Sequence, residues 1–383
     1  MTRPCTNRPL RILVAHNVSR ELTGGMSRLL GFIHQQLVLA GHAVDYFCAE
    51  DLPPSLKGRL ARFSFPAMVF RHARAAAQAG RRYDIVNVHE PQGAVLGLLK
   101  GLAGRPQVVV TTHGVERRGW QRLLEEAERG REQVKLTSRV LFPATVLSQT
   151  RVALSHADHI FCLNTEDSEY LAANFRIPSS RITRIYPAAN PVYAEVAAQR
   201  DYTRKKTLLF AGTWLKRKGT LDLIAAFTAL ASRHSELQLV ILNGGVEESA
   251  IQSSFPDEIC SRVICRRAEP EQGTAEAMAA ADIYLLPSLF EGTPLTLMEA
   301  MYSGLPIVST AVCGMKDVIK DGRNGLLVPL RAPQAIIATV ERLLSDSALR
   351  ARLGQAARAE ALEKYNWPRV AGPVREVYER LCP

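Results

Sequence analysis

The sequence predicts an α/β protein with two doubly wound parallel sheets, one after the other along the chain. Short runs of β-branched and apolar residues alternate with longer helical patterns, an order typical of parallel sheets covered by helices. The alternation stops once, at 186–206, where Pro, Ala and polar residues predict a linker, and then resumes. The length of 383 residues agrees with two domains, since one domain ordinarily takes about 100–200 residues.

The first series of elements predicts an N-terminal domain over residues 1–190. Its strand-like runs are 11–17, 43–48, 84–90, 107–114, 159–164 and 182–187. Helical patterns at 25–40 and 92–103 lie between strands of this series. Ligands of open α/β sheets gather at the carboxyl ends of the strands. Residues that end these runs are therefore candidates for a binding site.

The second series predicts a C-terminal domain over residues 191–367, and a cleft between the two sheets is the expected place for a ligand. Its strand-like runs are 206–212, 237–244, 262–267, 282–288, 306–310 and 325–329. Its helical patterns are 219–233, 271–280, 295–303, 332–345 and 347–364. A last amphipathic pattern covers 367–381. It either completes the second domain or crosses back onto the first, in which case the helix 368–383 acts as a hinge.

The charge is unevenly distributed, with a net value of +11 for the whole chain. Residues 1–200 hold 26 Lys+Arg against 16 Asp+Glu, and the remainder holds 22 against 21. This surplus predicts an anionic partner, such as a membrane surface, a nucleic acid or a phosphorylated substrate. The seven scattered cysteines contain no C-x-x-C pair, which favours reduced, buried thiols over a disulfide framework or a zinc site. No apolar run reaches the length of a membrane span, and the start has no apolar core of signal-peptide length before the first strand, so we expect a cytoplasmic protein.

Two glutamates flank the start of one predicted helix in SLFEGTPLTLMEAMYSGLPIVST (288–310). Glu291 precedes the helix, which begins near Pro294, and Glu299 lies about one turn inside it. The first N–H groups of a helix lack internal partners and carry a partial positive charge, so they bind anions. A carboxylate accepts hydrogen bonds from both hydroxyls of a diol. The pattern favours a ligand with a central diphosphate and sugars at both ends; the alternative is one surface glutamate and one capping residue.

A basic loop in FAGTWLKRKGTLDLI (210–224) repeats the order of strand, glycine-containing loop and helix. Its basic residues are Lys216, Arg217 and Lys218. They either reach diphosphate oxygens, as lysines do in other phosphate loops, or form a solvated basic loop. The sequence contains no Asp-x-Asp, so we expect no metal-bridged diphosphate, and the helix ends and lysines would supply the countercharge.

The first half offers weaker candidates. Gly24 and Gly25 follow the first strand and precede a helix, where they either let a ligand approach the backbone or form a tight turn. His113 ends a strand, where it either faces the cleft or is a buried, hydrogen-bonded histidine. His16 and His89 end strands in the same way and carry less weight.

With these residues, the sequence resembles the retaining glycosyltransferase family four, the group 1 glycosyltransferases, over nearly its whole length. The stretch from Glu291 to Glu299 matches the E-x7-E motif of that family, and GMKDVIKDGRNGLLVP (314–329) matches the segment that follows. The resemblance implies the GT-B fold, in which two Rossmann-like domains face each other across a cleft. It also implies transfer of a sugar from a nucleotide diphosphate sugar to an acceptor hydroxyl, with retention and without a cofactor or metal.

The resemblance further implies a role for each matched position. Glu299 is expected at the ribose hydroxyls and Glu291 at the donor sugar. Lys218 is expected to neutralise the diphosphate, which Gly25 approaches from the opposite domain, and His113 to line the sugar pocket near the reacting carbon. The backbone that cups the diphosphate is expected to come from Gly292, Thr293, Pro294 and Leu295.

One departure from the family pattern concerns the phosphate clamp. Thr213 stands where members usually have an arginine, so Arg217 or Lys216 is expected to compensate.

Uridine, guanosine and adenosine diphosphate sugars all fit, and the acceptor is a saccharide or lipid-linked molecule of polysaccharide, lipopolysaccharide or glycolipid synthesis. Alternatives are a nucleotide-sugar epimerase of the same fold and an inactive binding module. Nucleic acid is not expected as a partner, since the charges do not interleave with aromatics as in a known module.

The segment 56–82 mixes arginines with Phe, Met and Val. It predicts either a helix that lies on an anionic membrane beside a lipid-linked acceptor, or an ordinary amphipathic helix with a solvated basic side. In the first case the protein is peripheral on the inner face of the membrane.

Overall fold

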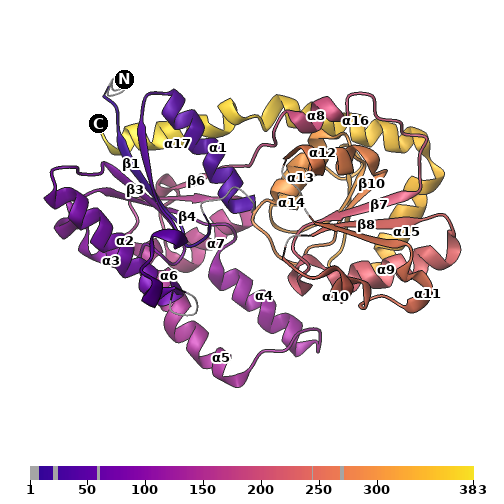
Figure 1. The fold of residues 1–383 in the computed structure, drawn as a ribbon, viewed down its shortest axis with the longest axis horizontal. Helices are drawn as coiled ribbons and strands as arrows, with labels where there is room; N and C mark the ends of the chain where they lie inside the picture. Colours follow the sequence, from indigo (N-terminus) through magenta and orange to yellow (C-terminus); the bar gives the residue numbers. More distant parts are fainter. Residues whose placement is uncertain (1–7, 20–24, 58–60, 244, 268–270) are drawn as a thin grey trace. The chain divides into compact units, whose positions relative to one another are not determined.

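The computed structural model describes residues 8–19, 25–57, 61–243, 245–267 and 271–383 (Figure 1). The chain forms two compact units. One consists of Met1–Tyr186 together with Trp367–Pro383, and the other of Pro187–Asn366. Each unit contains a six-stranded sheet in which all recorded strand pairs are parallel. The prediction of two parallel sheets is therefore confirmed.

The sheet of the first unit has the order β2-β1-β3-β4-β5-β6. Its strands are β1 (Arg11–Ala15), β2 (Ala43–Phe47), β3 (Ile85–His89), β4 (Gln107–Thr111), β5 (His159–Cys162) and β6 (Ile182–Arg184). Each strand lies within a run that the sequence predicted. The order reverses between β1 and β3, and this reversal is the place where doubly wound sheets bind ligands.

Eight α-helices of the described residues belong to the first unit. They are α1 (Gly25–Leu39), α2 (Ala61–Gln78), α3 (Ala94–Leu99), α4 (Glu116–Glu128), α5 (Leu136–Phe142), α6 (Ser148–His156), α7 (Thr165–Phe175) and α17 (Trp367–Leu381). In α2, Phe65, Val69 and Phe70 are buried in the core, whereas Arg71 and Arg74 are exposed. The segment 56–82 thus contains an amphipathic helix with a solvated basic side.

The sheet of the second unit has the order β12-β11-β10-β7-β8-β9, so it reverses between β10 and β7. Its strands are β7 (Thr207–Ala211), β8 (Gln238–Asn243), β9 (Val263–Arg267), β10 (Ile283–Leu286), β11 (Ile307–Thr310) and β12 (Leu326–Val328). The helices are α8 (Val192–Val196), α9 (Thr220–Arg233), α10 (Glu248–Gln252), α11 (Asp257–Cys260), α12 (Glu271–Ala280), α13 (Leu295–Tyr302), α14 (Cys313–Val318), α15 (Pro333–Ser345) and α16 (Ser347–Lys364).

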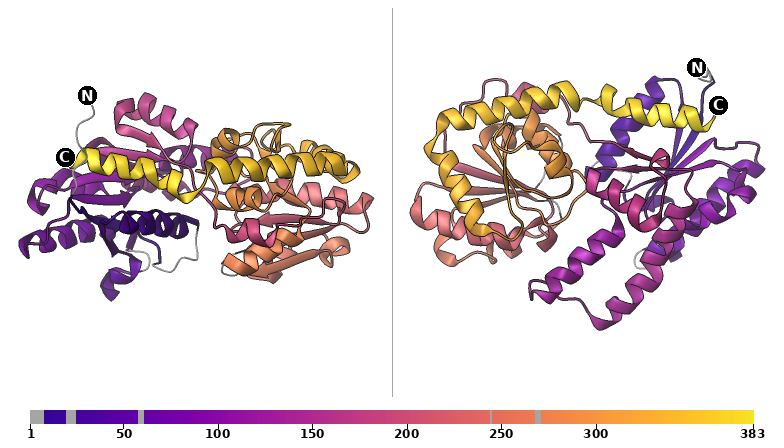
Figure 2. Two further views of the ribbon diagram at one scale, coloured as in Figure 1. Left: turned by 90° about the horizontal axis from the view of Figure 1, so that it is seen from above. Right: turned by 180° about the vertical axis from the view of Figure 1, so that it is seen from behind.

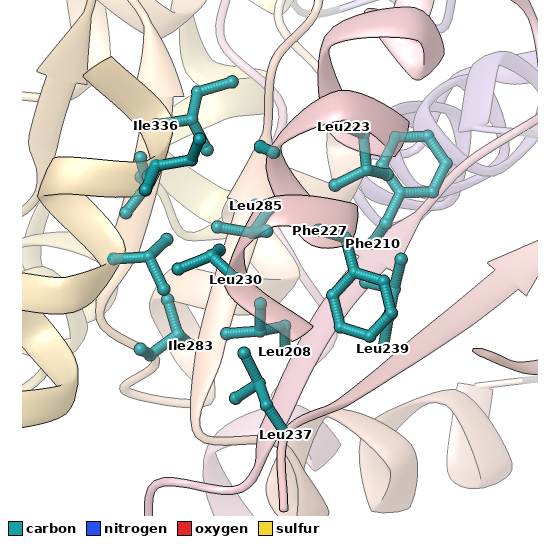
Figure 3. Close-up of a cluster of buried hydrophobic side chains, with 14 of the residues drawn as sticks. Leu208, Phe210, Leu223, Phe227, Leu230, Leu237, Leu239, Ile283, Leu285 and Ile336 are labelled. Carbon is teal, nitrogen blue, oxygen red and sulfur yellow. The ribbon is translucent and has the colours of Figure 1, made fainter. Parts of the chain in front are cut away.

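The core of the second unit follows from two sequence periods (Figure 3). Leu208 and Phe210 alternate along β7, so they point to one face of the sheet. Leu223, Phe227 and Leu230 recur every three or four residues on α9, and this stripe packs against the core cluster that contains both strand residues. This packing fixes the position of α9 relative to the sheet, and so the position of the loop between β7 and α9.

The predicted linker at 186–206 is more ordered than its composition indicates. After the unit boundary at Tyr186, the segment forms α8, and Tyr193 is completely buried. The Arg200 guanidinium donates to the backbone carbonyls of Met278, Ala281 and Ser303 at 2.6–2.7 Å. The segment is therefore part of the second unit and not a free connection.

Candidate functional site

Two loops meet at the reversal point of the second sheet. One follows β7 and contains a short 3-10 turn, η7 (Lys216–Lys218), before α9; the other follows β10 and leads into α13. The strands β7 and β10 are hydrogen-bonded neighbours, and Leu289 N donates to Arg217 O at 2.8 Å across the two loops. The basic loop and the glutamate motif, which lie about seventy residues apart in the sequence, thus form one site.

Glu291 is held by three side chains in this site. The residue is 7% exposed, and its carboxylate forms an ion pair with Lys218 Nζ. Ser288 Oγ donates to Glu291 Oε1 at 3.2 Å, and Arg217 Nη1 lies 3.7 Å from Oε2. Half of the Arg217 side chain is exposed, so its pair is weak, whereas Lys218 is 14% exposed. Lys218 is therefore the main counterion of Glu291, and the alternative of a surface glutamate at position 291 is wrong.

Gly219 brings the basic loop close to the β10 loop. It has a positive φ of 75° and caps the start of α9. A Cβ atom at this position would lie 1.9 Å from Pro287 O, so only glycine fits. The amino end of α9 is consequently packed against the carboxyl end of β10.

A second close contact fixes the Gly-Thr-Pro stretch. Gly314 N, at the start of α14, donates to Gly292 O at 2.9 Å. A Cβ atom at Gly314 would lie 1.9 Å from Thr293 Oγ1 and 2.6 Å from Gly292 O. Gly314 belongs to the segment that resembles the family, but its role as a support of the site was not predicted.

Glu299 lies inside the first turns of α13, which begins at Leu295 with Pro294 as its N-cap. Its side chain is fully buried, so the alternative of a surface residue is also wrong at this position. The hydroxyl of Tyr284 on β10 donates to Thr296 Oγ1 at 2.9 Å. Burial raises the pKa of Tyr284, and the negative charges of Glu299 and Glu291 raise it further. Both carboxylates of the motif thus act on the same phenol.

The remaining predicted residues of this unit are the Gly-Thr-Pro-Leu stretch and Thr213. Gly292, Thr293, Pro294 and Leu295 are buried in the loop and the first turn of α13. Thr213 is exposed, and its carbonyl accepts a hydrogen bond from Leu215 N at 2.9 Å. Ser288 and Tyr284 complete the site; both lie in the predicted strand 282–288, but nothing in the sequence singles them out.

In the first unit, three histidines gather where the order of the sheet reverses. His113 follows β4, and its Nε2 lies 2.7 Å from Nδ1 of His89, the last residue of β3. Their rings stack at 4.7 Å, and His16, which follows β1, meets His89 edge-on at 6.0 Å. Burial lowers the pKa of His113 to about 4 and that of His89 well below its usual value. In the His89–His113 pair, both rings are therefore neutral near pH 7, and one nitrogen donates to the other.

The glycine pair of the first unit is only partly described. Gly25 is the exposed first residue of α1, and Gly24 lies outside the described residues. Gly25 and His113 belong to the first unit, and Glu291, Lys218 and Glu299 to the second. Within the described ranges, no group of three or more His, Cys, Asp or Glu side chains is arranged to hold a metal ion. No described helix has the length and apolar content needed to cross a bilayer.

Comparison with known proteins identifies the family. Residues 23–192 match the family described as "Glycosyltransferase Family 4", and residues 194–360 match "Glycosyl transferases group 1". The chain belongs to this glycosyltransferase family. The predicted resemblance is confirmed, and the match favours a glycosyltransferase over an epimerase or an inactive binding module.

Three similar proteins illustrate the match. A phosphatidyl-myo-inositol mannosyltransferase of Mycolicibacterium smegmatis is 25% identical over 97% of this chain and 94% of its own length. The structure of sucrose-phosphate synthase from Thermosynechococcus elongatus superposes with a TM-score of 0.77 at 21% identity, covering 97% of this chain and 99% of that one. Anabaena HepE, solved with UDP-glucose, gives a TM-score of 0.69 at 16% identity, covering 97% and 100%. These likenesses confirm that the glycosyltransferase has the GT-B fold.

Proposed function

We propose that this glycosyltransferase moves the sugar of a nucleoside diphosphate sugar to the hydroxyl of a lipid-linked or saccharide acceptor, with retention at the anomeric carbon. The observation that carries the proposal is the buried Glu291–Lys218 pair, which lies in the same loop cluster as the buried Glu299. Glu299 binds the ribose hydroxyls. Lys218 and the amino end of α13 bind the diphosphate, and Glu291 contacts the donor sugar.

Catalysis in this proposal means stabilising the leaving group. The bond between the anomeric carbon and the phosphate oxygen breaks, and its electron pair goes to the diphosphate. Lys218 and Arg217 stabilise that charge as it develops, which is the main way such sites accelerate a reaction. The acceptor oxygen attacks on the face that the diphosphate leaves, and a leaving phosphate oxygen takes its proton. Because Glu291 already holds Lys218, the ammonium is oriented before the donor binds.

His113 contributes from the first unit. One of its nitrogens is engaged by His89, so the other is left to exchange a hydrogen bond with a sugar hydroxyl. The imidazole is neutral because burial lowers its pKa to about 4. A neutral ring lines the sugar pocket without adding a positive charge next to the developing sugar cation.

The relatives support a choice of substrates. HepE was solved with UDP-glucose, and the mycobacterial relative is named for mannosyl transfer to a phosphatidyl-inositol. We infer a uridine or guanosine diphosphate hexose as donor and a lipid-linked acceptor of glycolipid or cell-surface polysaccharide synthesis. No cofactor or metal is needed, and the enzyme works in the cytoplasm, peripherally at the inner membrane face.

Nucleotide binding by a Glu299→Gln variant tests the proposal. Thermal unfolding is measured with UDP, GDP and ADP; a ligand at 100 times its Kd stabilises by about 2.7 kcal/mol. We expect one of them to stabilise the wild type, and Glu299→Gln to bind it at least about tenfold more weakly, since a diol loses its charged acceptor. Glu236→Gln is the matched control, because Glu236 is an exposed carboxylate of the same unit.

Two outcomes contradict the proposal. The first is unchanged sugar transfer by a folded Glu299→Gln or Glu299→Ala variant. The second is conversion of a nucleotide sugar into its epimer when the enzyme is incubated without an acceptor, which would indicate the epimerase alternative.

A further inference from the structure

Between β4 and β5 the chain leaves the sheet of the first unit as a pair of helices. α4 is followed by a turn at 129–135 and by α5, and we call residues 116–142 the α4–α5 hairpin. Figure 1 and the right-hand view of Figure 2 both show it extending away from the strands of that unit. Trp120 and Phe142 stack at 4.4 Å and join the two helices near the base. α5 continues through a wider helical turn, η5 (Pro143–Leu147), into α6.

The outer side of α5 is apolar and exposed. Leu136 is 81% exposed, Val140 69% and Leu141 60%, and Leu136 has the largest exposed fraction of any large hydrophobic among the described residues. Single exposed apolar side chains are ordinary on a protein surface. Three within one helix of seven residues are a local concentration, and such patches mark docking sites.

A basic row runs beside the apolar one. Lys135 and Arg139 are four residues apart, as are Leu136 and Val140, so the two rows lie next to each other on the helix surface. Two acidic residues of α4 pair with arginines other than Arg139: Glu125 with Arg122 at 2.6 Å and Glu126 with Arg131 at 2.9 Å. No ion pair joins Lys135 or Arg139 to another described residue.

We propose that α5 docks the enzyme on an anionic lipid surface. Leu136, Val140 and Leu141 enter the boundary of the acyl chains, and Lys135 and Arg139 bind the phosphates of the head groups. The proposal rests on the lipid-linked acceptor of the proposed function, which it places beside the enzyme. A second copy of the chain fits less well, because two identical basic rows would face each other and repel.

The structure favours α5 over α2 for this contact. The large apolar residues of α2 are mostly buried, as Phe65, Val69 and Phe70 show, so its solvent side offers Arg71 and Arg74 without an apolar row. Helix α2 supplies long-range attraction to an anionic surface, whereas α5 supplies both attraction and insertion.

Co-sedimentation with vesicles tests the proposal without any donor or acceptor. One set of vesicles is phosphatidylcholine alone, and the other contains phosphatidylglycerol as well. We expect the wild type to bind only the anionic vesicles, and more strongly at low salt. The triple variant Leu136→Ser/Val140→Ser/Leu141→Ser should lose at least about tenfold in binding, because hydroxymethyl groups gain little from the acyl boundary.

Two further variants test whether vesicle binding depends on α5 itself and on its basic residues, and not on exposed leucines in general. Leu98→Ser/Leu99→Ser/Leu102→Ser removes three exposed leucines of the same unit, at the end of α3 and the following 3-10 turn, and should leave binding unchanged. Lys135→Gln/Arg139→Gln should reduce binding by about fivefold per residue at low salt, and less at high salt. Circular dichroism confirms that each variant is folded.

The proposal is overturned if the wild type binds neither kind of vesicle, or if the serine triple variant of α5 binds as well as the α3 control. It is also overturned if light scattering shows a wild-type dimer that the α5 variant abolishes, since the surface would then be an interface between copies. Sugar transfer to a detergent-dispersed acceptor is assayed separately. Vesicle binding without transfer would refute the proposed function and leave the docking surface intact.

Discussion

At the scale of single residues, the Glu291–Lys218 ion pair balances the two charges that lie between the loops after β7 and β10. Both side chains are largely removed from water, and each charge depends on the other, because an unpaired buried charge is costly. The pair also keeps the ammonium from folding back into solvent. In the proposed donor complex, the same ammonium would also bind the diphosphate.

Replacing Lys218 should reduce turnover more than donor binding. For Lys218→Gln we expect kcat to fall by about 10²–10³-fold, the usual effect of removing one preorganised donor from a developing anion. Lys206→Gln, which changes an exposed lysine of the same unit, is the control and should change kcat little. Steady-state kinetics with the donor identified by thermal shift gives both constants. A Lys218→Gln variant with wild-type kcat and a raised KM would show that Lys218 only binds the ground state.

Buried histidines make the first unit sensitive to acid. His34 on α1 bonds to Tyr46 Oη at 2.9 Å through Nδ1, and burial, with a contribution from His16, lowers its pKa to about 3. The unfolded chain binds a proton near pH 6.5, so the stabilisation by neutral His34 is present above that pH and is lost as the pH falls toward 3. The loss amounts to about 1.4 kcal/mol per pH unit within this window.

A His34→Gln variant tests this linkage, since glutamine does not titrate. Denaturant unfolding at pH 7 and pH 5 gives the free energy of unfolding of both proteins. We expect the wild type to lose about 2 kcal/mol more than the variant between the two values. Equal losses would mean that other groups control the acid response.

In the second unit, the sequence indicated candidate donor-site residues but not the contacts between them. Helix-end chemistry and the family motif predict Glu291 and Glu299 as donor-site residues, and the basic loop predicts Lys218. The roles of these residues stay predictions, but all three lie in or next to the loops that follow β7 and β10. The ion pair itself, and the support from Ser288 and Gly314, depend on how loops distant in the chain fold against each other. No local pattern carries that information.

At the scale of elements, glycine contacts set the separation of the loops. The amide of Gly314 bonds to the Gly292 carbonyl, and the missing side chain leaves room for Thr293.

The strands of both units were predictable because β-branched runs bounded by polar residues are typical of buried strands. The α4–α5 hairpin was not predicted, since α4 is largely polar and most apolar residues of α5 are exposed to solvent.

Substituting Gly314 should damage the donor site. In Gly314→Ala the added methyl would overlap backbone and side-chain atoms of Gly292 and Thr293, so the loop before α13 must move. We expect a loss of stability of about 1–3 kcal/mol and weaker binding of the nucleotide. Gly372→Ala in α17 is the control, because nothing lies within 4 Å of its added Cβ and alanine favours a helix. Calorimetric titration of both variants would contradict the expectation if Gly314→Ala bound the nucleotide as tightly as the control.

At the scale of the molecule, the chain passes between the units twice, after Tyr186 and after Asn366. The second passage takes α17 to the first unit, where Tyr378 Oη accepts a hydrogen bond from Asn87 Nδ2 at 2.6 Å and Trp367 stacks on Phe32 at 4.6 Å. α16 remains in the second unit, held by Arg350, which donates to the carbonyl of Tyr202 at 2.7 Å. The sequence showed an amphipathic helix at 367–381 but not which unit it covers, because its apolar stripe fits either sheet.

Removal of α17 should therefore destabilise the first unit, although α17 follows the second unit in the sequence. A chain that ends at Asn366 lacks the buried face of α17, including Trp367, Val374 and Tyr378, and exposes the apolar surface that this face covers. We expect amide hydrogen exchange to accelerate in β1, β3 and β4 and to stay unchanged in β7 and β10. Tyr378→Phe removes only the hydroxyl and should cost about 1–2 kcal/mol, since the Asn87 amide loses a buried partner. Faster exchange confined to β7 and β10 after the truncation would contradict this assignment, because it would mean that α17 stabilises the unit to which α16 belongs.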